Sequence, residues 1–220
     1  MIYIQIVLIN YYIKIELQFM KFLFDLGGVF FDWDPKYFFK DIFPDPKDLE
    51  FFLTKVCNDS WNLKQDAGRT INEAENEIIP KFPSYERQIR MYYTNHRRMI
   101  KRTFIESIEA LNQLKHYNYP CYVLSNWSAE TFKGMEDDYD FLNQFDGMII
   151  SGEDKLIKPD SAIYQLAIHR FDLDPKMTIF IDDKLVNVQA AKKNGFKTIH
   201  LIDPTKIKEK INFFLKNALK

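Results

Sequence analysis

The sequence predicts an α/β fold in which a doubly wound parallel sheet is interrupted by an α-helical insert. Short apolar runs that end in turn or polar residues recur along the chain, at residues 22–24, 122–124, 148–150 and 179–181. Runs of this length are typical of buried strands, and the helical patterns between them favour parallel strands. A long helical stretch at residues 35–102 lies between the first two runs. We therefore expect a Rossmann-like core with a small helical unit inserted into it.

Composition and charge restrict the class of function. The 220 residues are 46% hydrophobic and 28% charged, so the chain can bury a substantial core. The net charge is −1 and no basic tract stands out, so we expect no nucleic-acid partner. Cys57 and Cys121 provide neither a disulfide framework nor a metal-binding spacing. This cysteine usage favours a reducing, cytoplasmic location. The sequence carries no signal for an oligomeric state.

The first nineteen residues are apolar in part, but Lys14 and Glu16 interrupt them. The stretch is too short and too polar to span a bilayer, and it lacks the basic start and cleavage site of a signal peptide. We expect no membrane partner. Met20 directly precedes the first predicted strand, so our hypothesis is that Met20 is the natural start and residues 1–19 an extension from a mis-assigned start. An added edge strand is the alternative.

The first strand ends in Asp25-Leu26-Gly27-Gly28. In open parallel sheets, ligands bind beyond the carboxyl ends of the strands, so we expect Asp25 to project into a crevice. Gly27 and Gly28 allow the backbone to turn sharply and to approach a ligand closely, because they lack Cβ. The alternative is that Asp25 ends the strand only because Asp favours turns.

Residues 35–102 form the predicted helical insert, which begins after Asp34-Pro35, a helix-start signal. Thr70 and Glu73 have the spacing of a capping box at the start of a later helix. Four residues of the insert are candidates for substrate contact: Trp61, Asn62, Asp66 and Arg69. For this group we favour structural roles, namely helix packing for Trp61 and turn formation for Asp66.

The core is expected to resume at residue 103. Aliphatic side chains then recur at every third residue and predict an amphipathic helix whose apolar face is Ile105, Ile108, Leu111 and Leu114. Further helices are expected over residues 161–171 and 186–194, with a last strand over 197–201 and a C-terminal helix after Asp203-Pro204. The core domain is therefore assigned to residues 20–34 and 103–220, and the helical insert to residues 35–102.

Polar groups with distinct chemistry follow the four predicted strands. In chain order they are Asp25, Ser125, Lys158 and the pair Asp182-Asp183, and parallel strands bring such groups to one edge of a sheet. This order resembles the haloacid dehalogenase (HAD) superfamily, whose motifs are a nucleophilic Asp, a Ser or Thr, a Lys and an acidic pair. The resemblance covers about residues 21–202. The first motif, Asp-Leu-Gly-Gly-Val, is most similar to phosphatases that include sugar-1-phosphate phosphatases.

The resemblance implies a Mg²⁺-dependent phosphomonoester hydrolase that forms an aspartyl-phosphate on Asp25. Its substrate would be a small phosphorylated metabolite such as a sugar phosphate. Oxygen ligands suit Mg²⁺, and those implied are Asp25, the Gly27 backbone carbonyl, Asp182 and Asp183. The implied catalytic residues are Asp25, Ser125 and Lys158. The implied substrate-binding residues are Gly28, Ser125, the N–H of Asn126, Trp127 and Lys158. The insert would be a cap that excludes water.

One position departs from the family pattern. HAD phosphatases usually carry a second Asp two residues after the nucleophile, where it acts as general acid, and this chain has Gly27 there. A general acid contributes ~10²–10⁴-fold to the rate. Its loss favours a better leaving group, such as the anomeric hydroxyl of a sugar-1-phosphate, or a substitute donor such as Asp32 or a residue of the insert, or slow turnover.

Three other functions share some of these groups. Dehalogenases of the superfamily also lack the second Asp, but they need no metal, so the pair Asp182-Asp183 favours a phosphatase. Phosphorylated receiver domains use a similar set, but their acidic pair comes first in the chain. A non-catalytic protein that binds a phosphorylated ligand is the third alternative, since Gly27 removes a catalytic group.

Overall fold

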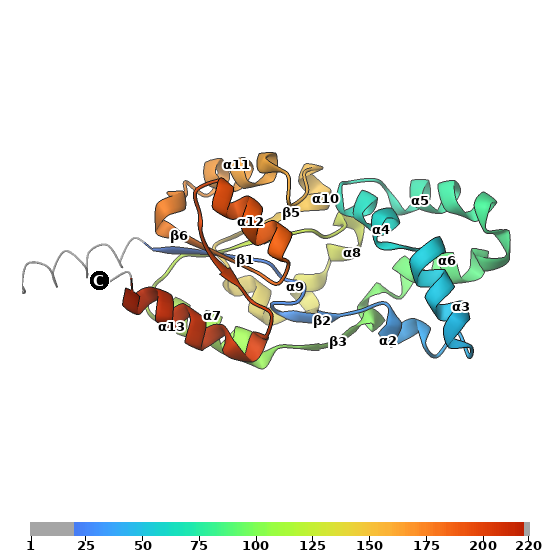
Figure 1. Cartoon of the computed structure of the whole chain (residues 1–220), viewed down its shortest axis with the longest axis horizontal. Helices are drawn as coiled ribbons and strands as arrows, with labels where there is room; N and C mark the ends of the chain where they lie inside the picture. The colour runs from blue at the N-terminus through green and yellow to red at the C-terminus, as the bar shows by residue number, and fades with distance from the viewer. Residues whose placement is uncertain (1–19, 218–220) are drawn as a thin grey trace, which may run out of the picture.

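The structure is a computed structural model that describes residues 20–217. The predicted extension at residues 1–19, with the edge strand considered as its alternative, lies outside the described residues. Two lobes lie side by side along the long axis (Figure 1). One is an α/β lobe, and the other is built from the helices between residues 36 and 94. A two-stranded antiparallel ribbon of β2 (Phe31–Trp33) and β3 (Ile100–Thr103) runs between them.

The α/β lobe is built on a five-stranded parallel sheet in the order β5-β4-β1-β6-β7. These strands are β1 (Lys21–Phe24), β4 (Cys121–Ser125), β5 (Gly147–Ile150), β6 (Thr178–Asp182) and β7 (Lys197–His200). The chain adds strands on one side of β1 and then crosses to the other side, so the direction of winding reverses between β1 and β6. Ligands bind at such a reversal in doubly wound sheets. The predicted α/β fold class is confirmed.

Helices cover both faces of the sheet. Along β1, Phe22 and Phe24 belong to one buried cluster while Leu23 belongs to another on the opposite face, as the two-residue period of a strand requires. Helices α7 (Ile105–His116) and α13 (Ile207–Asn217) lie on the first face, and α11 (Ser161–Arg170) and α12 (Leu185–Lys193) lie on the second (Figure 1). Three short helices lie near the ends of the strands: α8 (Ala129–Phe132), α9 (Met135–Asp138) and α10 (Ser151–Asp154).

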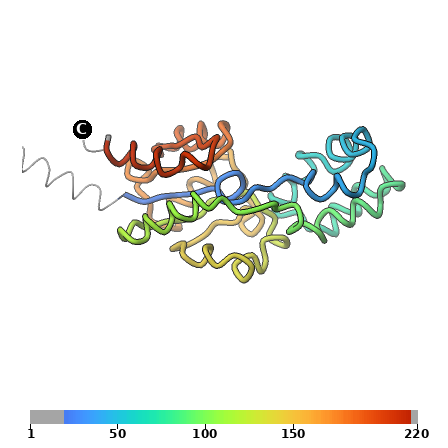
Figure 2. Tube along the Cα trace, turned by 90° about the horizontal axis from the view of Figure 1, so that it is seen from below, coloured from blue at the N-terminus to red at the C-terminus, as the bar shows by residue number. Residues whose placement is uncertain are grey.

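The helical lobe has a buried cluster of its own, formed largely by aromatic side chains such as Phe39, Phe52 and Tyr92. Its α-helices are α2 (Lys36–Phe39), α3 (Pro46–Phe51), α4 (Asp59–Asp66), α5 (Ile71–Ile78) and α6 (Glu86–Thr94). The capping box is confirmed, since Thr70 and Glu73 exchange side-chain and backbone hydrogen bonds at the start of α5. Figure 2 shows this lobe extending beyond the end of the sheet. Its action as a cap stays a prediction.

Two local expectations differ from the structure. The strands β2 and β3 were not predicted, because runs of three and four residues that mix apolar and charged side chains carry little periodic signal. The expected apolar face of α7 is wrong at its start, since Ile105 is 58% exposed and Ser107 is fully buried. Three residues turn a helix by about 300°, which is less than a full turn. Side chains at every third residue therefore do not stay on one face of the helix.

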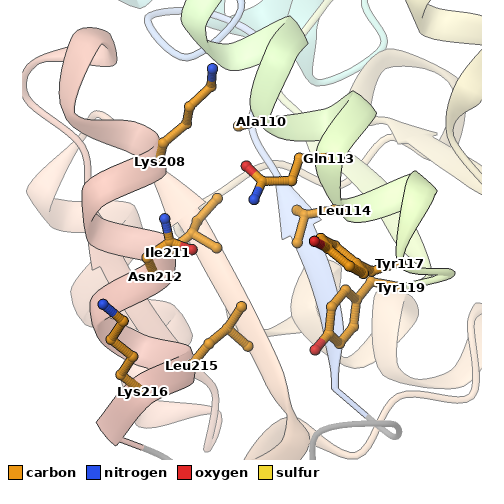
Figure 3. Close-up of a pocket in the computed structure, with 10 residues that line it drawn as sticks. All are labelled: Ala110, Gln113, Leu114, Tyr117, Tyr119, Lys208, Ile211, Asn212, Leu215 and Lys216. Atoms are coloured by element: carbon orange, nitrogen blue, oxygen red, sulfur yellow. The ribbon is translucent and has the colours of Figure 1, made fainter.

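A cavity of about 250 Å³ lies between α7 and α13 (Figure 3). Apolar side chains such as Leu114, Ile211 and Leu215 line it, with Lys208 and Lys216 among its polar neighbours. None of the motif residues predicted from the sequence reaches this cavity. None of the helices between residues 20 and 217 combines the length and apolarity needed to cross a membrane.

We expect Ser107→Ala to destabilise the protein more than Ile105→Ala, although the sequence pattern indicates the reverse. The Ser107 hydroxyl donates a hydrogen bond of 2.6 Å to the Val29 carbonyl. Its removal deprives a buried acceptor of its donor, at a cost of about 1–3 kcal/mol. Ile105 is exposed, so its truncation should stay within about 0.5 kcal/mol. Urea unfolding of both variants measures the difference, and equal losses would contradict this packing of α7.

Candidate active site

The predicted motif residues meet at the carboxyl ends of β1, β4 and β6. A cavity of about 330 Å³ opens there, and both lobes contribute to its walls. The α/β lobe supplies Asp25, Gly27, Gly28 and Asp183, and the helical lobe supplies Asn62, Leu63, Asp66 and His96. The crevice expected in front of Asp25 is therefore present.

Asp25 follows the central strand and is only 6% exposed. Its Oδ1 accepts hydrogen bonds from the Leu26 amide at 2.7 Å and the Ser125 hydroxyl at 2.8 Å, and Lys158 Nζ lies 3.0 Å away. Among the described residues no donor reaches Oδ2. One carboxylate oxygen is thus fixed by three donors, and the other is available for chemistry.

Lys158 lies between two carboxylates in a site closed to solvent. Its Nζ is 2.7 Å from Asp182 Oδ2 and 3.0 Å from Asp25 Oδ1, with 1% of the side chain exposed. Burial opposes the charge, but the carboxylates of Asp182 and Asp25 outweigh it and raise the pKa of Lys158. The side chain is therefore an ammonium. Its backbone is fixed by Asn126, whose side chain donates to the Lys158 carbonyl and accepts from the Lys158 amide.

The two members of the acidic pair have different surroundings. Asp182 is fully buried, and its oxygens accept from Lys158 Nζ, the Lys184 amide and Asn187 Nδ2. In Asp183, Oδ1 is buried and has no hydrogen-bond partner among the described residues. Asp182 therefore orients Lys158, whereas Asp183 has an oxygen free for a further ligand.

The carboxylates of Asp25, Asp182 and Asp183 carry more negative charge than Lys158 can balance. One oxygen from each lies within 4.8 Å of the others. Burial raises the pKa of Asp25 to about 7 despite the opposing charge of Lys158, and the other two carboxylates add to the increase. Burial likewise raises the pKa of Asp183. A divalent cation with oxygen ligands fits this charge and donor set, and Asp183 Oδ1, which has no hydrogen-bond partner among the described residues, is free to hold it.

The turn after Asp25 requires glycine at one position only. Gly28 has a φ of +68°, and a Cβ there would lie 2.4 Å from Asp183 Cγ. At Gly27 a Cβ would meet nothing within 4 Å. Gly28 therefore lets the turn after Asp25 pass directly beside the acidic pair, while Gly27 lines the cavity without a steric reason to be glycine.

Comparison with known proteins gives the family. Residues 53–201 match the family model described as haloacid dehalogenase-like hydrolase. The chain belongs to this family of hydrolases. Sesquiterpene phosphatase AstK of Aspergillus oryzae is 26% identical over 181 residues, covering 82% of this chain and 89% of that protein. The (S)-2-haloacid dehalogenase 1 of a Pseudomonas species is 27% identical over 96 residues, covering 44% of this chain and 42% of that protein.

Solved structures share the fold. A HAD family enzyme from Bacteroides thetaiotaomicron, in complex with magnesium and inorganic phosphate, gives a TM-score of 0.63 at 24% identity and covers 82% of this chain and 92% of that one. A predicted HAD-like hydrolase from Porphyromonas gingivalis gives a TM-score of 0.68 at 20% identity, covering 89% of this chain and 98% of that one. The family resemblance predicted from the sequence is confirmed.

In this HAD hydrolase, two of the four candidate side chains of the helical lobe make contacts within that lobe, and the other two line the cavity. Trp61 is 4% exposed and packs against Tyr92, in agreement with the packing role that we favoured. Arg69 donates to the side chains of Gln65 and Glu77 and to a backbone carbonyl, and it does not line the cavity. Asn62 and Asp66 do line it. Asp66 is the last residue of α4, directly before the turn, and lies in the wall of the cavity, so a contact with substrate stays a prediction.

The structure places Trp127 at the cavity as well. Its ring packs edge-on against Phe31 and Phe132, and its indole Nε1 is buried with no hydrogen-bond partner among the described residues. Its substrate-binding role stays a prediction, as does that of the Asn126 amide, for which the structure shows in addition the side-chain contact to Lys158.

Three residues of the site were missed in the sequence. Asn187 holds both oxygens of Asp182, His96 lines the cavity, and the Ser151 hydroxyl donates to the Asp66 carbonyl and accepts from the Trp127 amide. Asn187 lies in the first turn of α12, shortly after Asp182, and this short separation is a usable signal. No sequence signal indicates Ser151 or His96, because their partners lie far away in the chain.

Gly28→Ala should destabilise the protein and Gly27→Ala should not. Alanine in the left-handed region costs about 1–2 kcal/mol, and at position 28 its Cβ also collides with Asp183. Gly27→Ala is the matched control, expected within about 1 kcal/mol of the wild type. Urea unfolding monitored by circular dichroism measures both. Equal stability of the two variants would contradict the close approach of Gly28 to Asp183.

Proposed function

We propose that this HAD hydrolase is a Mg²⁺-dependent phosphomonoester hydrolase that acts through an aspartyl-phosphate on Asp25. The observation that carries the proposal is the asymmetry of the carboxylates around Lys158. Asp25 has one oxygen fixed by three donors and one free, and Asp183 has a buried oxygen without a partner. A carboxylate nucleophile beside oxygen atoms that suit a divalent cation is an arrangement that supports transfer of a phosphoryl group.

The protein groups divide the work of the reaction. Asp25 Oδ2 attacks phosphorus, the bond from phosphorus to the leaving oxygen breaks with its electron pair on that oxygen, and water later attacks phosphorus to release Asp25. Lys158 supplies a fixed positive charge to phosphoryl oxygens in a site that excludes water, where such charges act most strongly. Ser125 orients Asp25 through its hydrogen bond. Bound Mg²⁺ would neutralise the charge between substrate and carboxylates.

The comparisons support a phosphatase over a dehalogenase. The likeness to the Aspergillus sesquiterpene phosphatase extends over 82% of this chain, whereas that to the Pseudomonas dehalogenase covers 44%. The Bacteroides enzyme of the same fold binds magnesium and inorganic phosphate. The substrate is proposed to be a small phosphorylated metabolite, in keeping with a cavity of about 330 Å³. A sugar phosphate and a terpenyl phosphate are the two classes to compare.

Asp25→Asn should abolish phosphate release. Wild-type protein with Mg²⁺ is assayed on glucose-1-phosphate, glucose-6-phosphate, farnesyl phosphate and p-nitrophenyl phosphate, and release should disappear with EDTA. The amide of Asn cannot replace the carboxylate nucleophile, while its Oδ1 still accepts from Leu26 and Ser125. Release that persists in Asp25→Asn would overturn the proposal. Release of halide from a 2-haloacid, with none from any phosphate, would favour the dehalogenase.

Mg²⁺ should raise the melting temperature of the wild type but not that of Asp183→Asn. A ligand at 100 times its Kd stabilises the native state by about 2.7 kcal/mol, which for a chain of this size is roughly 5–10 °C. The exposed Asp137→Asn is the control and should keep the wild-type shift. Differential scanning calorimetry with and without Mg²⁺ makes the measurement. An unchanged shift in Asp183→Asn would exclude this carboxylate as a ligand.

A further inference from the structure

We propose that Asp66, from the helical lobe, is the general acid that protonates the leaving-group oxygen. It would replace the general acid that HAD phosphatases usually carry at the position occupied here by Gly27. This inference rests on the proposed phosphatase function.

The position of Asp66 is fixed across the two lobes. It is the last residue of α4, and its backbone carbonyl accepts a 2.6 Å hydrogen bond from the Ser151 hydroxyl of the α/β lobe. The backbone of Ser128, also in the α/β lobe, lies close enough to the Asp66 carboxyl group to oppose the rise in its pKa. These contacts hold the end of α4 against the α/β lobe and place the side chain in the wall of the cavity that contains Asp25.

Asp66 and Asp25 enter this cavity from different lobes. In phosphoryl transfer, the attacking and leaving oxygens lie roughly in line on opposite sides of phosphorus. Because Asp25 approaches from the end of the sheet, the leaving oxygen points away from the sheet, toward the wall supplied by the helical lobe. A proton donor is needed on that side, and Asp66 lies there.

The surroundings of Asp66 suit a group that both gives and takes a proton near neutral pH. Burial raises its pKa to about 7, Lys184 opposes this effect, and Asp25 adds to it. General acids work best when their pKa is close to the working pH.

The other carboxyl and imidazole groups of the cavity wall either have other partners or have a pKa unsuited to a general acid. Asp25 and Asp183 belong to the cation site. Asp32 accepts from the Tyr37 hydroxyl at one oxygen and pairs with Arg102 at the other. Burial lowers the pKa of His96 to about 4, so its imidazole is neutral and is a poor proton donor at neutral pH. Among the described residues, Asp66 is the carboxyl group that remains.

The proton balance closes over the two half-reactions. When Asp25 Oδ2 bonds to phosphorus and the leaving oxygen departs with the electron pair, that oxygen takes the proton of Asp66, which becomes a carboxylate. In the second half-reaction, this carboxylate takes a proton from water as the water oxygen attacks phosphorus. The bond to Asp25 then breaks, phosphate leaves, and Asp66 is again protonated.

The test compares two substrates that differ by one nitro group, which makes the leaving phenol of one a much stronger acid than that of the other. Phenyl phosphate needs a protonated leaving oxygen far more than p-nitrophenyl phosphate, whose nitrophenol is the stronger acid. We expect Asp66→Asn to lower kcat/KM for phenyl phosphate by ~10²–10⁴-fold and for p-nitrophenyl phosphate by less than about tenfold. kcat/KM reports steps up to phosphoryl transfer to Asp25, so loss of water activation in the second half-reaction does not enter it.

Matched variants distinguish a general-acid role of Asp66 from a structural role and from the alternative donor Asp32. Asn keeps the size and shape of the Asp66 side chain, and circular dichroism with thermal melting checks the fold. Asp59→Asn, on the exposed start of the same helix, should leave both substrates unaffected. Equal loss on both substrates in Asp66→Asn, no loss on either, or selective loss in Asp32→Asn would each overturn the assignment of Asp66. Failure of the wild type on both substrates would instead overturn the phosphatase itself, and the role of Asp66 with it.

Discussion

The ion pairs of Lys158 organise the active-site end of the sheet. One ammonium lies between carboxylates from the ends of β1 and β6, almost without contact with solvent. Removal of one partner from a buried pair costs about 3–5 kcal/mol, because the remaining charge is left uncompensated. The position of Asp25 therefore depends on Lys158, that of Lys158 depends on Asp182 and Asn126, and that of Asp182 depends on Asn187.

The fold was predictable from local properties of the sequence, whereas parts of the site depend on contacts between distant segments. The five strands of the sheet and most flanking helices follow from periodicity and turn residues, which are local properties of the chain. The motif residues were predictable because each follows a strand, so topology alone brings them to one edge. Ser151 and His96 were not, because their roles are defined by contacts with segments far away in the sequence.

Local packing shows the same difference between features encoded by neighbouring residues and features set by distant contacts. The capping box of Thr70 is encoded within four residues and was predicted correctly. The face of α7 depends on which side chains meet the sheet, and here the buried Ser107 reaches the Val29 carbonyl while Ile105 faces solvent. Hydrophobicity alone cannot indicate that a serine belongs in the core, because the acceptor that satisfies it comes from another element.

The contact between Gly28 and Asp183 constrains how this sequence can evolve. A side chain at position 28 would occupy the space of the Asp183 carboxyl group, so the two positions form one packing unit although they lie in different motifs. A lineage that acquires a larger residue at position 28 must relinquish the carboxylate at position 183 or displace the turn. Among descendants of this protein, replacements at positions 28 and 183 are therefore expected to occur together rather than singly.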